Sequence, residues 1–429
     1  MTTMRVIVRA CSTVIMMFAI GTSAIAAGGG SMYSSLGIGD LSGGLSVRNF
    51  GMGYTGVALS SNVALNLNSP ASWAGIARTQ LEAGATYQGF SSTDGNASRY
   101  IANITLLDAK VGFPISPAHG ITLVGGFARY SNVDFDTYEN GTGYPGADTI
   151  AYSVHHQGDG GLGVGKLGLS YTPLPWLAVG ASFDYYFGTI HYTRTFAPAS
   201  TSYNGARFTE TTMYHGPGGT FGLLVTGFDW IAPSLNTLAV GASISARSDV
   251  KSSSQTVLGF GADPTNYPSE EDTSASVEGT VVIPVTYTVG LAYTAGSRYV
   301  FATDFSAQLW KHSTFNGVAP SNLGNSSRFG IGFERTSSRE TNASWGDRVA
   351  LRLGATFGTL YYRPKNTAID QWLITGGATV PLSRTSRLAL GLEYGARGTT
   401  SNGLVRDRIF RITASVSLGE LWFVQLPDE

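Results

Sequence analysis

A two-residue alternation runs through much of this chain and is clearest at residues 388–395. Leu388, Leu390, Leu392 and Tyr394 are large and apolar, and the residues between them are small or polar. Because successive side chains of a strand point to opposite faces, one face of this strand is apolar. Charged residues make up only 13% of the chain, about half of their share in a typical soluble domain. The pattern predicts an all-β fold, a transmembrane antiparallel β-barrel that leaves no backbone edge unpaired in lipid.

Residues 1–27 are typical of a secretory signal peptide. Arg5 and Arg9 give a basic start, residues 10–20 are mainly apolar, and Ser23 to Ala27 supply small residues for cleavage. The apolar run is too short for a membrane-spanning helix, which needs about 20 residues. Cys11 is the only cysteine and lies inside this segment. The mature chain therefore has no thiol for a disulfide or a thiolate metal site.

The rest of the chain divides at residue 78. Residues 28–78 are rich in Gly, Ser and Asn and lack alternation, so we expect a compact hatch or plug segment inside or beneath the barrel. Residues 79–429 are the expected barrel, with about 14 strands, an even number as in bacterial outer-membrane barrels. The expected strands are 79–91, 98–113, 120–134, 150–172, 176–196, 207–228, 236–252, 279–294, 298–311, 325–336, 345–362, 369–382, 386–398 and 406–422.

The connections between these strands alternate in length. The second, fourth, sixth, eighth and twelfth are short and contain turn residues, whereas the third, fifth, seventh and ninth are long and polar. Outer-membrane barrels have short periplasmic turns and long external loops. If the N-terminal segment starts in the periplasm, the first strand runs outward and the odd-numbered connections are external, which agrees with their greater length. The tenth connection, around Ser337 to Ala343, is longer and breaks the trend.

Strand parity assigns side chains to the lipid or to the lumen. In the strand expected at 345–362, Val349, Leu351 and Leu353 face lipid and Arg352 faces the lumen. Gly391 also faces the lumen, where we expect a serine to be tolerated. Other charged residues on inward parity are Lys166, Asp304, Glu393 and Arg411.

Two interpretations of these inward charges are open. They pair with one another or hold the N-terminal segment, or Arg352, Lys166 and Arg411 bind the carboxylate of a substrate. Arg352 is the first candidate, because arginine binds carboxylates with two hydrogen bonds. The glycines of residues 157–161 interrupt the fourth strand and predict a bulge or a kink that opens the wall.

Other classes of function find little support in the sequence. His155 and His156 are adjacent and so point to opposite faces of a strand, which disfavours a metal site. No nucleophile–base spacing stands out, and a net charge of −1 gives no electrostatic case for nucleic acid. We expect no metal, no cofactor, no nucleic-acid partner and no enzymatic activity.

The order of motifs resembles the FadL family of outer-membrane transporters. Residues 51–58 and 66–75 are similar to the glycine-rich opening of that family and its Asn-Pro-Ala hatch element, although Ser69 stands where the family has Asn. Residues 283–293 and 302–310 resemble its Pro-containing and Asp-containing strands. Residues 390–398 and 418–423 are similar to FadL-like proteins of the Bacteroidota type. The residues that carry the hatch motif are Asn66, Asn68, Ser69, Pro70 and Ala71.

The resemblance implies a 14-stranded barrel in the outer membrane of a Gram-negative bacterium, in contact with outer-membrane lipid and lipopolysaccharide. Its implied function is passive uptake of long-chain fatty acids or other hydrophobic compounds, which enter an apolar lumen pocket and leave by hatch movement or through a gap in the wall. The alternative is a FadL-like docking or shuttle component of type IX protein secretion. A continuous apolar cavity favours transport, whereas a packed lumen with exposed apolar loop tips favours docking.

Overall fold

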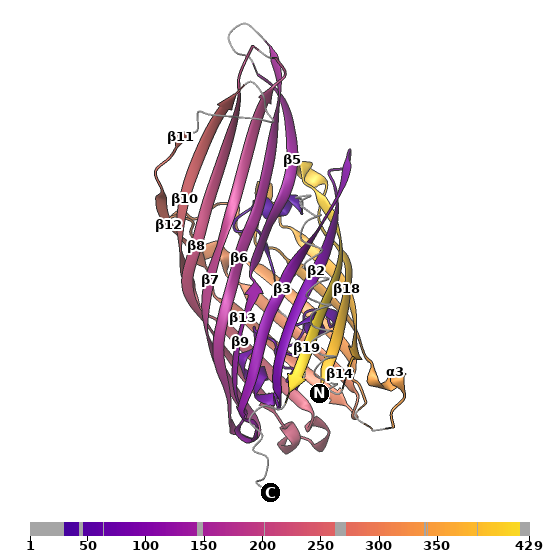
Figure 1. Ribbon diagram of the computed structural model, residues 1–429. Helices are drawn as coiled ribbons and strands as arrows, with labels where there is room; N and C mark the ends of the chain where they lie inside the picture. Colours follow the sequence, from indigo (N-terminus) through magenta and orange to yellow (C-terminus); the bar gives the residue numbers. More distant parts are fainter. Residues whose placement is uncertain are drawn as a thin grey trace, which may run out of the picture.

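The computed structural model describes residues 30–42, 46–62, 64–143, 149–200, 202–261, 272–338, 340, 342–383 and 385–420. The signal peptide predicted at residues 1–27 lies outside this part of the chain. The described chain forms one closed antiparallel sheet (Figure 1). Its strands are β1 (Asp40–Leu41), β2 (Thr79–Thr93), β3 (Ser98–Ser116), β4 (Ile121–Arg129), β5 (Ser131–Gly143), β6 (Ile150–Leu174), β7 (Leu177–Pro198), β8 (Gly205–Thr226), β9 (Leu238–Ser245), β10 (Ser248–Gly261), β11 (Asp272–Thr273), β12 (Val277–Ile283), β13 (Thr286–Ala295), β14 (Tyr299–Gln308), β15 (Ser326–Arg335), β16 (Ala350–Thr359), β17 (Asp370–Pro381), β18 (Ser386–Gly398) and β19 (Arg406–Glu420).

These segments form the 14 expected barrel strands. The pairs β4–β5 and β9–β10, and the three segments β11 to β13, are each one interrupted barrel strand, and β1 belongs to the N-terminal segment. The last strand closes the barrel on the first, because β19 pairs with β2 from Arg406 opposite Thr93 to Glu420 opposite Thr79. A closed sheet leaves no free edge in the hydrocarbon core, as the alternation predicts.

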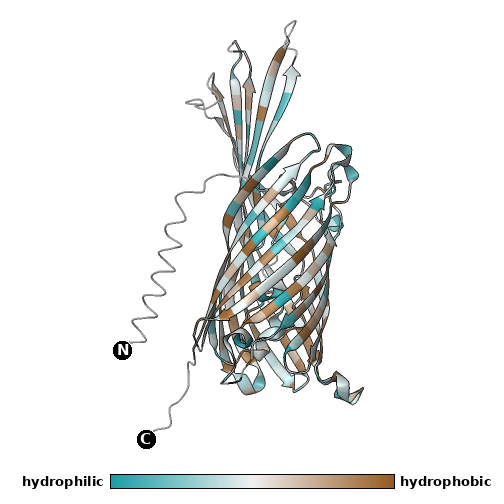
Figure 2. Ribbon diagram, turned by 90° about the vertical axis from the view of Figure 1, so that its right-hand side faces the viewer, coloured by the Kyte–Doolittle hydropathy of each residue, from teal (hydrophilic) through white to brown (hydrophobic). Residues whose placement is uncertain are grey.

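The outward face of the barrel is apolar, so the predicted parity is confirmed for most strands. Leu390, Leu392 and Tyr394 are 39%, 53% and 53% exposed, and hydrophobic residues recur along the strands (Figure 2). Leu351 and Leu353 also point outward. The prediction for Val349 was wrong, because this residue precedes β16 and is buried.

The strand expected at 345–362 begins later than predicted, because its first residues form the short helix α3 (Trp345–Arg348). The Ser344 side chain caps this helix by accepting a hydrogen bond from the backbone N–H of Asp347. The tenth connection is therefore a structured loop at the base of the barrel, where α3 projects sideways (Figure 1).

The interruptions of the barrel strands have local causes. Pro284 separates β12 from β13, since proline has no N–H to donate to the sheet. Gly160 and Gly161 of β6 have φ of +108° and +133° and lie opposite the junction of β4 and β5 at Tyr130. The interruption predicted at residues 157–161 is not in β6, which runs unbroken from Ile150 to Leu174, but in the neighbouring strand, between β4 and β5.

One side of the barrel is much taller than the other. Strand β6 has 25 residues, and β7 and β8 have 22 each, whereas β14, β15 and β16 have 10 each. About 9–11 residues suffice to cross a membrane. Strands β5, β6, β7, β8 and β10 therefore continue beyond the span and form a one-sided external wall (Figure 1).

The described N-terminal segment contacts inward-facing side chains of the barrel. It contains 3-10 helix η2 (Met32–Ser35), β1, helix α2 (Val47–Gly51) and 3-10 helix η3 (Pro70–Gly75). The backbone N–H groups of Gly56 and Val57 donate to Asp304 at 2.7 and 2.9 Å, and Thr356 donates to the carbonyl of Gly53. Among the described residues, none of the helices is long and apolar enough to cross a membrane.

Candidate functional site

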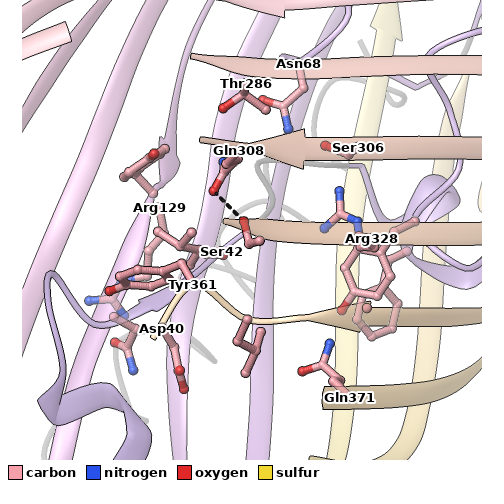
Figure 3. A pocket seen from close by; sticks show the side chains of 18 of the residues that line it. Asp40, Ser42, Asn68, Arg129, Thr286, Ser306, Gln308, Arg328, Tyr361 and Gln371 are labelled. Carbon is pink, nitrogen blue, oxygen red and sulfur yellow. Dashed lines mark hydrogen bonds between the residues drawn. The ribbon is translucent and has the colours of Figure 1, made fainter. Parts of the chain in front are cut away.

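A cavity of about 260 Å³ lies in the lumen, lined in part by the N-terminal segment (Figure 3). Strands β9, β13, β14 and β15 form one wall of this cavity, and the loop after β16 together with the N-terminal segment forms another. The volume is slightly below the usual range for ligand pockets, roughly 300–1,000 Å³. The cavity therefore has room for a small organic molecule.

One wall of the cavity is polar because the strand register places hydroxyl and amide side chains side by side. Two neighbouring rows of residues run across these strands. Within each row the residues are directly paired from strand to strand, and all of them line the cavity. The first row is Ser243, Thr288, Ser306 and Arg328, and the second is Ser245, Thr286, Gln308 and Ser326. This wall offers a continuous hydrogen-bonding surface to a ligand.

Arg328 ends the first row and is the cation of this wall. In the described structure its guanidinium forms no ion pair or hydrogen bond, and its nearest specific contact is the ring of Tyr54, 5.1 Å from the ring centroid. Arg129 also lines the cavity, beside the break between β4 and β5. Both side chains border the same space (Figure 3). The cavity therefore carries arginine charge that a bound anion could compensate.

The remaining lining mixes aromatic and aliphatic residues with polar ones in about equal number. Tyr130 and Tyr186 meet edge to face, with ring centroids 5.0 Å apart. Phe50 and Tyr54 of the N-terminal segment meet in the same way, with centroids 5.4 Å apart. The apolar pocket expected from the sequence is therefore present only in part, because a polar wall faces these rings.

The cavity is bordered by a seam in the barrel wall between β3 and β5. The register pairs β3 with β4 only from Asp108 to Ser116, and the upper part of β3 pairs with β2 alone. Beyond the break, β5 pairs with β6 and, at two residues, with β1. The lining residues at this border are Thr105, Leu106, Leu107, Arg129, Tyr130 and Asn132.

Side chains rather than backbone hydrogen bonds cross this seam. Arg99 of β3 donates to the carboxylate of Asp136 at 3.0 Å and to its carbonyl at 2.9 Å. The Asn103 amide donates to the Asp134 carboxylate. A seam held by two polar contacts separates more easily than a ladder of backbone hydrogen bonds, because each contact is local and partly exposed to solvent.

The three cations predicted to bind substrate all have carboxylate partners. Lys166 lies 2.5 Å from Asp184, Arg352 binds Glu334 at 2.7 Å, and Arg411 binds Glu393. Lys166 and Arg411 line the cavity, whereas Arg352 is not among its lining residues. The structure thus brings two of the three to the cavity. Substrate binding by any of them stays a prediction.

The hatch motif contacts the barrel wall near its base. Pro70 and Ala71 lie against Gly180 and Gly222, where a Cβ on either glycine would come within 2.8 Å of their backbone. Ser69 donates to the carbonyl of Val57 at 3.2 Å. The Asn66 side chain accepts from the N–H of Asn68 at 3.0 Å, and the carbonyl of Asn68 accepts from Ser243 at 2.7 Å. A hatch function for this motif stays a prediction.

Sequence reasoning missed Arg129 and Arg328 among the residues that line the cavity. Arg328 shares the inward parity of Gly330 and Gly332, so the same rule that selected Arg352 would have found it. Arg129 has the outward parity of β4 and reaches the cavity because the strand breaks at the next residue. Its position follows from the break, for which the sequence of β4 gives no signal.

The fold is shared with solved transport proteins. The toluene transporter TbuX of Ralstonia pickettii is 16% identical, with a TM-score of 0.58 over 88% of this chain and 98% of that one. The toluene transporter TodX of Pseudomonas putida is 16% identical, with a TM-score of 0.57 over 90% and 100%. A FadL homologue of Pseudomonas aeruginosa is 12% identical, with a TM-score of 0.60 over 88% and 99%.

At these identities the likeness shows the fold, including a closed barrel of the FadL type. Among curated proteins, none matches this sequence. The family model described as BamG matches residues 6–426, almost the whole chain. The chain therefore belongs to the BamG family.

Proposed function

We propose that this barrel lies in the outer membrane and takes up small hydrophobic compounds passively. A ligand enters from the external side, binds in the lumen cavity and leaves sideways through the seam between β3 and β5. The solved proteins with this fold include two described as toluene transporters, which supports the proposal. No step of this route requires a cofactor or a covalent reaction.

The position of the cavity at the seam carries the proposal. Thr105 and Leu106 of β3 and Arg129 of β4 line the cavity and also border the seam. A ligand in the cavity therefore lies directly inside the wall at the seam. A lateral route also bypasses the base of the lumen, where the hatch motif packs against β7 and β8.

The size and lining of the cavity favour small ligands over long-chain fatty acids. A long acyl chain is stabilised by apolar contacts along its length, at about 0.8 kcal/mol per buried CH₂ group. Here the polar rows of β9, β13, β14 and β15 occupy one wall. A compact molecule can place an apolar body on the aromatic side of the same cavity.

Crosslinking the seam tests the proposed route. The natural sequence has a single cysteine, Cys11, inside the predicted signal peptide, so introduced cysteines are unambiguous. We expect Asn103→Cys with Asp134→Cys, joined by a short thiol crosslinker, to abolish uptake of labelled toluene by Gram-negative cells that carry the barrel. Without crosslinker, the same cells should take up more toluene than cells with an empty vector.

A second cysteine pair controls for crosslinking itself. Ser253 and Ser276, whose hydroxyls are 2.6 Å apart in the external wall, lie away from the seam. Crosslinked Ser253→Cys with Ser276→Cys should leave uptake unchanged. Equal uptake with the seam open and closed would refute the lateral route, and equal uptake with and without the barrel would refute the function.

The external wall favours docking to type IX secretion components as a second candidate function. Its described side chains include exposed aromatic residues, and a concavity lies on β6, β7, β8 and β10. Tyr138 and Phe260 are 63% and 46% exposed, and Phe196 and Phe208 line the concavity. Affinity purification with Tyr138→Ser and Phe208→Ser variants tests this candidate. It predicts that type IX components bind the natural chain and that the variants lose them.

A further inference from the structure

The cavity combines three features that specify a ligand class. Among the described residues it has an arginine, Arg328, with no direct ion pair, on which the carboxylates of Asp304 and Glu393 act only at longer range. It also has two rows of hydroxyl and amide groups and two pairs of aromatic rings. Most other lumen cations are already paired, as with Lys166 and Asp184 or Arg397 and Asp40. The unpaired state of Arg328 is therefore local to this cavity and calls for a specific explanation.

We propose that the cavity binds a small organic anion with an apolar ring or body and one carboxylate or similar oxyanion, and that Arg328 binds the anionic end. The proposal rests on the proposed function and names the substrate class of the same site. Arginine holds a planar carboxylate through two parallel hydrogen bonds, which gives orientation as well as affinity. The ring of Tyr54, 5.1 Å from the guanidinium carbon, supports the arginine from one side.

The polar rows select for further hydrogen-bonding groups on the ligand. The Thr288 hydroxyl donates to Ser306 Oγ at 3.0 Å, and each of the two oxygens can still accept a further hydrogen bond. Gln308 uses its carbonyl oxygen for Trp310 at 2.8 Å and for Ser326 at 3.4 Å, which leaves its amide N–H groups as donors (Figure 3). A hydroxylated aromatic acid satisfies such donors and acceptors, whereas a plain hydrocarbon leaves them without partners.

Arg129 adds a second positive group at the seam side of the cavity. In the described structure it has no hydrogen bond or ion pair, and it borders the break between β4 and β5. A ligand that leaves Arg328 therefore meets another cation before the seam. Two successive weak anion sites allow movement from one to the other, because neither holds the ligand too tightly.

Calorimetric titration of the purified barrel in detergent tests the ligand class. The probes are 4-hydroxybenzoate, its neutral counterpart 4-methylphenol, and palmitate. We expect 4-hydroxybenzoate to bind at least roughly tenfold more tightly than 4-methylphenol, since a hydrogen bond to a charged group contributes about 1.5–3 kcal/mol. Equal or tighter binding of 4-methylphenol or palmitate, or no binding of 4-hydroxybenzoate, would overturn the proposal.

Variants of the arginine test the assigned contact. Arg328→Gln should weaken 4-hydroxybenzoate binding roughly tenfold and leave 4-methylphenol binding unchanged, and Arg328→Lys should restore part of the loss. The matched control is Arg247→Gln, which removes an exposed arginine that is paired with Asp249 outside the cavity. Binding by Arg328→Gln as tight as that of the control would overturn the role of Arg328.

The two proposals fail in different ways. Binding is measured on the purified barrel, whereas passive uptake is measured in cells with toluene and the seam crosslink. Binding of 4-hydroxybenzoate to the purified barrel, together with no barrel-dependent uptake of either toluene or 4-hydroxybenzoate by cells, would refute the uptake function and support the anion site. If Arg328→Gln does not fold, the comparison of 4-hydroxybenzoate with 4-methylphenol on the natural chain still decides the ligand class.

Discussion

Arg397 of β18 binds Asp40 of the N-terminal segment through two parallel contacts, with Nη1 3.0 Å from Oδ1 and Nη2 2.6 Å from Oδ2. The same guanidinium lies 3.0 Å from Asp407 of β19 through Nε, and Tyr362 donates to Asp40 at 2.9 Å. The Arg397 side chain is only 2% exposed. This ion pair joins the segment to the barrel wall at β1 itself, which pairs with β5 at the seam.

Asp40→Ala should loosen the N-terminal segment without unfolding the barrel. Removal of one partner of a buried ion pair costs about 3–5 kcal/mol, and we expect the lower end because Asp407 still faces Arg397. Limited proteolysis should cut the variant within residues 30–78 faster than the natural chain. The control Asp249→Ala breaks an exposed pair with Arg247 and should have little effect. Equal cleavage rates in Asp40→Ala and Asp249→Ala would contradict this role.

Lys166 and Asp184 allow a test of whether an inward-facing cation stabilises the barrel wall or binds the ligand. Lys166 Nζ also donates to Thr220 at 3.0 Å, and the Asp184 side chain is fully buried. Lys166→Met leaves this carboxylate without its cation and should lower the free energy of unfolding by about 3–5 kcal/mol. The double variant Lys166→Met with Asp184→Leu should recover much of that loss.

Urea unfolding from lipid vesicles measures each term of this double-mutant cycle. A strong positive coupling between residues 166 and 184 identifies the pair as part of the wall. If instead each single variant is as stable as the natural chain and 4-hydroxybenzoate binding falls with Lys166→Met alone, the earlier prediction of substrate binding by Lys166 is the correct one.

The sequence predicted the spanning strands well because one face of every span meets the same lipid. Leu390, Leu392 and Phe410 are exposed on that face whichever strand lies beside them. The lumen follows no such common rule. Arg352 pairs with Glu334, and Glu334 also binds Arg48 of the N-terminal segment, a contact that depends on how the segment threads the barrel. The individual ion pairs could therefore not be predicted from the sequence, although the existence of compensating lumen charges was predicted.

Leu390 and Gly391 show the same difference between the lipid face, whose properties follow from the sequence, and the lumen, whose contacts do not. Leu390→Arg places a charge on the lipid face and should lower stability by about 2–4 kcal/mol near the midplane. Gly391→Ser was expected from sequence to be tolerated, but a Cβ there would lie 2.6 Å from Cδ1 of Phe50. We now expect Gly391→Ser to displace α2 and to increase proteolysis of the N-terminal segment.

Ala389→Ser is the matched control for Gly391→Ser, since it adds a hydroxyl on the same face of β18 one residue pair away. Urea unfolding and proteolysis of the three variants separate the two effects: Leu390→Arg should change unfolding most, and Gly391→Ser should change proteolysis most. An undisturbed N-terminal segment in Gly391→Ser would show that Phe50 can move aside at little cost.

Asp347 holds the loop of α3 together at the base of the barrel, outside the spanning strands. Its carboxylate accepts hydrogen bonds from Ser344 at 2.7 Å, from Arg335 at 2.6 Å and from Arg298 at 3.0 Å. The hydrogen bond from Ser344, followed by that from Arg298, lowers the pKa of Asp347 below its ordinary value. A carboxyl group with a lowered pKa in the folded state stabilises the loop above its unfolded pKa, and this contribution is lost as the pH falls through the lowered value.

The loop should therefore stay closed at neutral pH and open only under acid conditions, with the transition below the ordinary aspartate pKa of about 3.9. Ser344→Ala removes the first cause of the shift, so the pKa of Asp347 should rise and the loop should open at a higher pH. The emission of Trp345, which is 69% exposed in α3, reports the opening when the spectrum of Trp345→Phe is subtracted. Asp347→Asn should abolish the acid transition. A transition that persists in Asp347→Asn would assign it to another group.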